Sequence, residues 1–280
     1  MTDYLERVVD IDDPHVTSSL DELHFWSSPF GRLLFDNLEL VGGIDVLDLG
    51  CGTGFPLFEL AHVHGTSCRF TGVDIWKSAM RRAARKLSVY QLENVHLVLG
   101  DGELLPFKNG AFDLIVSNLG LNNFADPRAA VGECARVARP GARIVLTTNV
   151  EGHMREFYEV YRRTLHELGK ADHIERLNAQ EAHRANHHVI GGWLQEAGFP
   201  VSRVVEESFH MRYLDGAAFL RHFLTVVGFL DGWRGVLEGD DEVAVFSALE
   251  ENLNALARRE GELRLTVPML YVEGQRPWPG

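Results

Sequence analysis

The sequence predicts an α/β fold built on a mainly parallel sheet. Between residues 44 and 150, short apolar runs alternate with segments of helical periodicity, and this alternation is typical of βαβ units. The runs are almost continuously apolar, as expected of strands that are buried on both faces. Two later strand-like segments, near 201–209 and 263–272, predict a hairpin added at one edge of the sheet.

The elements of this alternating region can be placed in chain order. Glycines stop the first strand, and Pro140-Gly141 turns the chain into the fifth strand. The predicted strands are 44–49, 69–74, 95–99, 112–117 and 143–148, and the helices between them are 55–64, 77–89 and 127–138.

The composition fits a soluble globular protein. The 280 residues carry 40 acidic and 27 basic side chains, a formal net charge of −13, which disfavours nucleic acid as a partner. No apolar run approaches the roughly 18 residues of a membrane span. Three cysteines without a CxxC pair, and an N-terminus without a signal-peptide pattern, predict a cytoplasmic location.

The strongest functional signal is a glycine loop that follows the first strand. Asp48 stands near the end of that strand, and Gly50, Gly52 and Gly54 alternate after it. Glycines let a ligand approach the backbone closely, because a Cβ atom would collide with it. The helix that follows presents free N–H groups to an acceptor. The loop therefore predicts a bound ligand.

The spacing of this loop separates two ligand classes. The dinucleotide fingerprint is Gly-x-Gly-x-x-Gly, whereas this sequence has Gly-x-Gly-x-Gly. Asp48 would also repel a pyrophosphate, but it suits a ligand with an ammonium group. The loop thus favours an amino-acid-bearing nucleoside over NAD.

Two further acids are expected at the same edge of the sheet. Asp74 ends the second strand, 20 residues beyond Gly54, where an acid can accept hydrogen bonds from ribose hydroxyls. A helix-capping role for Asp74 is the alternative. Asp101 follows the third strand and can accept from an exocyclic adenine amine, although turns of this type are common.

These motifs resemble the class I S-adenosylmethionine-dependent methyltransferases. The resemblance is specific across residues 44–150 and includes Arg136-Val-Ala-Arg-Pro-Gly-Ala-Arg-Ile-Val145. It implies a Rossmann-like seven-stranded methyltransferase sheet, mostly parallel, with an edge hairpin and helical cap insertions. The most similar group in pattern is that of the small-molecule ubiquinone and menaquinone C-methyltransferases. The resemblance also implies S-adenosylmethionine as cofactor, S-adenosylhomocysteine as product, and in-line methyl transfer to an unidentified small molecule.

The predicted organisation of the chain follows from the resemblance and the element pattern. Ser28-Pro29 is typical of a helix start. The predicted segments are an N-terminal helical lid at 1–43, a cofactor-binding Rossmann-like core at 44–150, a helical insertion at 151–185, a return to the core sheet at 186–210, a helical cap at 211–259, and a last strand and tail at 260–280.

The resemblance also implies roles for individual residues on the cofactor side. The acid and glycines of the loop would hold the methionyl part, the second acid the ribose, the third acid the adenine, and the segment after the fourth strand would face the sulfonium. The implied residues are Asp48, Gly50, Cys51, Gly52, Gly54, Asp74, Ile75, Asp101, Gly102, Glu103, Ser117, Asn118 and Leu119.

The acceptor side carries weaker signals. His153 is a candidate base with an ordinary pKa near 6.5, but a polar helix start is an equal interpretation. Tyr158 could line an apolar pocket or belong to the core of the cap. The catalytic candidates are His153, Asn118 and Tyr158, and the substrate candidates are Phe25, Trp26, Asn122, Asn123, His153 and Tyr158.

Other possibilities stay open at this point. His183 and His187 share a helix face, but no His-Glu-x-x-His pattern is present, so no metal is predicted. An NAD-linked oxidoreductase and a non-catalytic cofactor-binding partner protein are the functional alternatives. Cap helices could also supply the face of a homodimer.

Overall fold

A computed structural model describes residues 2–182, 184–237 and 241–278 and divides the chain into two compact units. The sheet unit comprises Ile11–Asn149, Asn186–Glu207 and Met269–Gly280. The helical unit comprises Met1–Asp10, Val150–Ala185 and Ser208–Pro268. The six segments predicted from the sequence stay a prediction.

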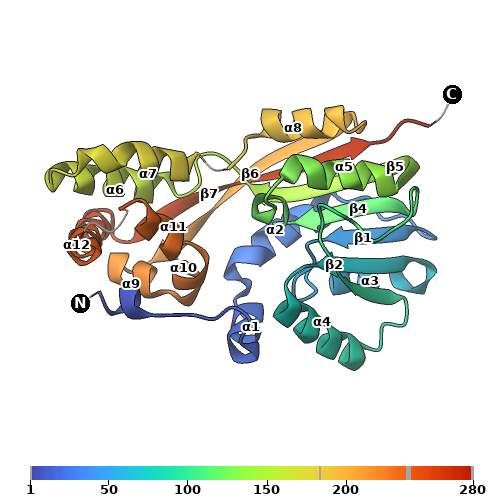
Figure 1. Cartoon of the computed structure of the whole chain (residues 1–280), viewed down its shortest axis with the longest axis horizontal. Helices are drawn as coiled ribbons and strands as arrows, with labels where there is room; N and C mark the ends of the chain where they lie inside the picture. Colours follow the sequence, from blue (N-terminus) through green and yellow to red (C-terminus); the bar gives the residue numbers. More distant parts are fainter. Residues whose placement is uncertain (1, 183, 238–240, 279–280) are drawn as a thin grey trace. The chain divides into compact units, whose positions relative to one another are not determined.

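The sheet has seven strands in the order β3-β2-β1-β4-β5-β7-β6 (Figure 1). Four pairs in the first five strands are parallel, and β7 runs antiparallel to β5. This confirms the Rossmann-like seven-stranded sheet with its edge hairpin. The strands are β1 Asp45–Leu49, β2 Arg69–Asp74, β3 Val95–Leu99, β4 Phe112–Asn118, β5 Ala138–Asn149, β6 Val201–Tyr213 and β7 Leu263–Gln275.

Four helices of the sheet unit pack on β2, β3, β4 and β5, whereas α1 packs on α4 and α8 packs on α5. Apolar side chains of these helices are buried because the strands they cover are themselves apolar. The helices are α1 Pro14–Asp21, α2 His24–Asn37, α3 Leu57–His64, α4 Lys77–Tyr90, α5 Pro127–Val137 and α8 His187–Glu196.

The predicted helix start at Ser28-Pro29 is wrong. Helix α2 begins at His24 and carries Pro29 inside it. A proline at this position removes one backbone hydrogen bond near the helix start. Burial of Phe30, Leu33 and Leu34 stabilises the helix by more than the loss of one such bond costs, and it keeps the earlier turn helical.

The helical unit is built around buried aromatic rings. Its helices are α6 Arg155–Glu167, α7 Ile174–Glu181, α9 Gly216–Arg221, α10 Phe223–Gly228, α11 Leu230–Gly235 and α12 Glu242–Glu260, with short 3-10 turns at Asp3–Glu6 and Ala171–His173. The first part of the predicted helical cap consists of three short helices, because His222 is extended between α9 and α10 and Phe229 is non-helical between α10 and α11. Among the described residues, no helix is both long and apolar enough to cross a bilayer.

Gly72 lies in the middle of β2, and its replacement by alanine is expected to destabilise the fold. A Cβ atom there would stand 2.5 Å from Leu57 Cδ2 and 2.8 Å from Cys51 Sγ. We expect Gly72→Ala to lower the free energy of unfolding by about 1–3 kcal/mol, measured by urea denaturation. The control is Gly132→Ala in α5, where no described atom lies within 4 Å of the new atom. That variant should be neutral or stabilised by up to about 1 kcal/mol.

Candidate active site

The glycine loop leaves β1 in a conformation that requires glycine. Gly50, Gly52 and Gly54 have φ angles of +76°, +52° and +101°, which side-chain-bearing residues rarely adopt. The Gly50 N–H donates to the carbonyl of Val73 in β2 at 2.9 Å. A Cβ atom on Gly54 would lie 2.0 Å from the ring of Phe58. The loop is therefore tied to the sheet and packed under α3.

Asp74 fixes the middle of this loop. Its Oδ2 accepts a hydrogen bond from the Gly52 N–H at 2.8 Å, and its Oδ1 accepts from the Trp76 N–H at 2.8 Å. The second contact forms a turn just before α4, and the helix-capping alternative is wrong because α4 has Trp76 as its N-cap and no side-chain capping bond. Each carboxylate oxygen has further lone pairs, so Asp74 can hold the loop and still accept from a ligand.

Asp48 is a fully buried carboxyl group whose two oxygens have no hydrogen-bond partner in the described part of the chain. Burial, and then the negative charge of Asp74, raise its pKa to about 8, and the N–H of Leu57 acts in the opposite direction. The neighbouring Cys51 thiol is buried against Met80 Sδ at 3.7 Å. Buried carboxyl groups are seldom left without a partner, so this site is suited to a cationic group.

The residues after β2 and β3 offer a polar edge beside apolar surface. Asp101 Oδ1 accepts from the Glu103 N–H at 2.9 Å. Gly102 is buried, and a Cβ atom there would lie 2.6 Å from the ring of Phe124. Ile75 is 68% exposed. An exposed apolar side chain next to polar acceptors fits the flat face and the amine of a nucleobase.

The segment after β4 is held tightly to its neighbours. Ser117 Oγ donates to the carbonyl of Leu49 at 2.7 Å, and Thr147 Oγ1 donates to Asn118 Oδ1 at 2.7 Å. Leu119 has a φ of +64°, and its N–H donates to the Thr147 carbonyl at 2.8 Å. These bonds fix the chain at the carboxyl end of β4, beside the end of β1.

Asn122 and Asn123 both use their amides within the protein. The Nδ2 of Asn122 donates to Thr148 Oγ1 at 2.8 Å and to Asn149 Oδ1 at 2.8 Å. The Nδ2 of Asn123 donates to the Leu119 carbonyl at 2.9 Å. Both contacts shape the loop after β4, and substrate contact by these residues stays a prediction.

Phe25 and Trp26 lie in α2 of the sheet unit. The Phe25 side chain is 50% exposed, and the ring of Trp26 packs on Phe30 with centroids 5.4 Å apart. An exposed aromatic ring is available for a ligand, whereas a ring already packed is partly committed to the fold.

His153 and Tyr158 lie in the helical unit, unlike all the residues above. Both side chains are buried. Burial, and then the positive charge of Arg184, hold the pKa of His153 well below its ordinary value. The Tyr158 hydroxyl accepts a hydrogen bond from Trp233 Nε1 at 3.3 Å. The predicted site residues therefore form one group in the sheet unit and a second group in the helical unit.

The expectation that His183 and His187 share a helix face cannot be followed, since His183 lies outside the described residues. His187 begins α8, and its Nδ1 lies 2.7 Å from Glu206 Oε1. Within the described ranges, no group of three metal-ligating side chains occurs.

Sequence reasoning missed two polar residues. Thr147 orients Asn118 from β5, and Arg184 places a guanidinium beside Tyr158. Thr147 sits in a strand pattern that any β-branched residue would satisfy. Arg184 sits in a polar segment without periodicity, so neither residue stands out in the sequence.

The chain is similar in sequence to known methyltransferases. A family model described as "Methyltransferase domain" matches residues 40–198. A nocamycin O-methyltransferase from Saccharothrix syringae is 30% identical over 90% of this chain and 92% of its own. A demethylmenaquinone methyltransferase from Lactococcus lactis is 27% identical over 64% of this chain and 69% of its own.

A solved structure shares the fold. The YcgJ protein from Bacillus subtilis superposes with a TM-score of 0.61 at 17% identity, covering 90% of this chain and all of its own. The family match does not favour either the NAD-linked oxidoreductase or the non-catalytic alternative. The glycine loop, the buried acid beside it and the matched family together show that the chain belongs to the S-adenosylmethionine-dependent methyltransferases.

Proposed function

We propose that the enzyme transfers a methyl group to the acidic hydroxyl of a small, ring-bearing molecule. The observation that carries the proposal is the similarity to the nocamycin O-methyltransferase, which covers 90% of the chain and hence most of the helical unit. The similarity to the demethylmenaquinone methyltransferase covers 64%. The acceptor-side residues His153 and Tyr158 lie in the helical unit, so the longer similarity is the more informative one.

On the cofactor side, the proposed roles follow the geometry of the sheet unit. S-Adenosylmethionine supplies an electrophilic methyl group on a sulfonium. Asp48 is proposed to pair with the ammonium group, because its buried carboxyl oxygens have no charged partner among the described residues and only the Leu57 N–H acts on them. Asp74 is proposed to accept from the ribose, and Asp101 from the adenine amine. Gly52 leaves open space, since no described atom lies within 4 Å of the position of a Cβ atom.

The remaining predicted cofactor residues are proposed to complete the same site. We assign to Ile75 the face of the adenine, and to the Ser117–Leu119 segment the neighbourhood of the sulfonium. Three bonds from β1 and β5 hold that segment, so it can align the reacting groups without moving. Alignment is a main source of rate in a displacement of this kind.

On the acceptor side, His153 is proposed as a weak base. Burial holds its pKa well below the ordinary value, so the imidazole is neutral at pH 7. A base of this strength removes a proton efficiently only from an acidic hydroxyl, such as that of an electron-poor phenol or an enol. Tyr158 is proposed to contact the same acceptor.

The test is a methyl-transfer assay with a matched panel. Methyl-labelled S-adenosylmethionine is incubated with the enzyme and with phenols, enolisable dicarbonyl compounds, and ring-matched anilines and thiophenols. We expect label in methyl ethers, and more label as the hydroxyl becomes more acidic. Labelling of carbon, nitrogen or sulfur instead of oxygen, or of no hydroxyl compound, would contradict the proposal.

His153→Gln is expected to reduce kcat about 10- to 100-fold with the best hydroxyl acceptor. The deficit should shrink as pH rises, because the acceptor then ionises in solution without a base. The wild-type enzyme should lose no activity between pH 8 and 6.5 through this residue, since the pKa of His153 lies well below 6.5. The control is His166→Gln at the exposed end of α6, which should leave kcat unchanged. A deficit that persists at high pH would exclude the role of a base.

The cellular setting is also a proposal. Cys51, Cys68 and Cys134 are free, buried thiols, which supports a reducing compartment such as the cytoplasm. A homodimer is testable by sedimentation.

A further inference from the structure

The half-buried Arg184 side chain of the helical unit has no carboxylate partner among the described residues. Arg184 lies between α7 and α8, and its Nη1 is covered by protein atoms without a hydrogen-bond partner there. Glu181, one turn earlier, is paired with Arg162. Covering one nitrogen of a cation without a counterion is unfavourable, so the position of Nη1 requires an explanation.

The surroundings of Arg184 are suited to a flat organic molecule. The Tyr158 hydroxyl lies beside the guanidinium and favours its charged form, although burial is the larger effect and lowers the pKa of Arg184. Trp233 donates to that hydroxyl, and the ring of Phe229 stacks on Trp233 with centroids 5.7 Å apart and an angle of 14°. His153 packs on Phe229, also at 5.7 Å. The aromatic rings form one connected cluster.

A second set of polar atoms joins this cluster. His222 Nδ1 is buried and lacks a hydrogen-bond partner within the described chain, whereas the buried hydroxyls of Tyr213 and Thr225 interact with each other. The ring of Tyr213 packs on Phe219 at 5.1 Å, and Phe219 packs on Trp233 at 5.7 Å. Native proteins leave few such atoms unsatisfied. His222 packs on Tyr213 at 5.5 Å, so its unsatisfied nitrogen lies beside the aromatic cluster and can receive a polar group of a ligand.

We propose that Arg184 is the anion-binding residue of the acceptor site, and that the acceptor is a planar ring compound carrying an ionisable oxygen. This inference rests on the function proposed above. As the hydroxyl proton moves to the His153 imidazole, the negative charge that forms on the acceptor is paired with the guanidinium. The oxygen–methyl bond forms while the sulfur–methyl bond breaks, so the sulfonium becomes a neutral thioether. Four rotatable side-chain bonds let Arg184 turn its covered Nη1 towards the ligand.

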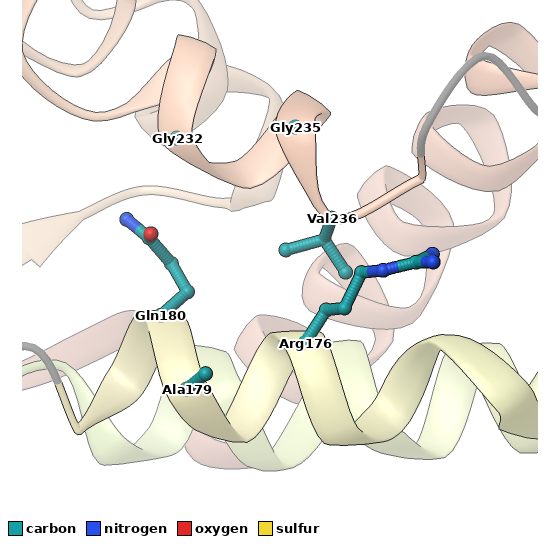
Figure 2. Close-up of a pocket in the computed structure, with 6 residues that line it drawn as sticks. All are labelled: Arg176, Ala179, Gln180, Gly232, Gly235 and Val236. Carbon is teal, nitrogen blue, oxygen red and sulfur yellow. The ribbon is translucent and has the colours of Figure 1, made fainter.

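A groove in the same unit is the competing location. It has a volume of about 450 Å³ and is lined by Arg176, Ala179 and Gln180 of α7 and by Gly232, Gly235 and Val236 (Figure 2). Its cation already has a neighbour, since Arg176 Nη1 lies 3.3 Å from His173 Nδ1. Figure 2 shows the guanidinium of Arg176 pointing away from Gln180. Arg176 is exposed, so its charge carries no desolvation cost, and it serves as the control.

The test uses two fluorescent probes that share an aromatic skeleton. Anilinonaphthalenesulfonate is an anion, and N-phenylnaphthylamine is its neutral counterpart. We expect Arg184→Gln to weaken binding of the anion by about tenfold or more, as for the loss of a hydrogen bond to a charged group. Arg184→Lys should restore much of the affinity. Arg176→Gln should change neither probe, and the neutral probe should bind all variants alike.

The readouts separate this inference from the proposed function. Binding of S-adenosylhomocysteine should be unchanged in Arg184→Gln, and this verifies that the variant is folded. The inference would be overturned if Arg184→Gln left the affinity for the anionic probe unchanged, or if it weakened the binding of both probes equally. This holds even if the enzyme forms methyl ethers. Anion affinity that depends on Arg184, together with label on carbon, would instead overturn the oxygen-acceptor proposal alone. Dependence on Arg176 would assign the anion to the groove.

Discussion

Asp48→Asn is expected to stabilise the protein without ligand while it abolishes most of the affinity for the cofactor. The carboxyl group is buried without a partner among the described residues, and its pKa is raised to about 8. Its unfolded-state pKa is near 4, so the folded protein binds this proton more tightly than the unfolded chain does. The free energy of unfolding therefore falls as pH rises from about 4 to about 8, by up to about 1.4 kcal/mol per pH unit. Asparagine removes this cost, and at pH 8 we expect a gain of up to roughly 5 kcal/mol.

The raised pKa of Asp48 also leads us to expect that cofactor affinity depends on pH. Pairing with the ammonium group requires the ionised acid, so binding below pH 8 must release a proton. The Kd for S-adenosylhomocysteine should fall by up to about tenfold per pH unit from pH 6 to 8, and titration calorimetry in buffers of different ionisation enthalpy should detect the proton. Asp48→Asn should bind weakly at every pH. Unchanged affinity in this variant would remove Asp48 from the cofactor site.

Asp45 supplies a control of opposite sign in the same strand. It pairs with Arg69 and Arg139, and the hydrogen bond from Arg69, which is the largest influence, holds its pKa below the ordinary range. Asp45→Asn should therefore lower the free energy of unfolding, and the loss should vanish as pH falls and the acid becomes protonated. Cofactor affinity should not change. Two aspartates three residues apart would then respond oppositely to one substitution.

The sequence predicts the cofactor half of this enzyme better than the acceptor half, and the reason is geometric. Buried parallel strands produce continuous apolar runs, and the glycine loop needs positive φ angles at fixed positions, so both leave a local pattern. The start of α2 is less predictable because burial outweighs the signal of Pro29. Arg184 and Tyr158 come from separate segments, and only the tertiary fold brings them together. The raised pKa of Asp48 likewise depends on burial, which composition and spacing do not show.

Gly52→Val is expected to remove cofactor binding while the fold survives. The position has a φ of +52°, and no described atom lies within 4 Å of where a Cβ atom would stand. We expect the substitution to lower the free energy of unfolding by about 1–2 kcal/mol through backbone strain, without a steric clash at the Cβ position. Its side chain would instead fill the space in which we propose that the cofactor binds. We expect the affinity for S-adenosylhomocysteine to fall by more than about 100-fold, a loss of roughly 3 kcal/mol.

Gly43→Val separates the two effects of that substitution. Gly43 precedes β1, has a φ of +74°, and likewise has no described atom within 4 Å of a Cβ position. It therefore carries the same kind of backbone strain at a place outside the predicted site. We expect both variants to lose similar stability in thermal denaturation, and only Gly52→Val to lose the ligand. Equal affinity in the two variants would mean that the open space at Gly52 faces solvent, and the glycine loop would then be a turn rather than a cradle.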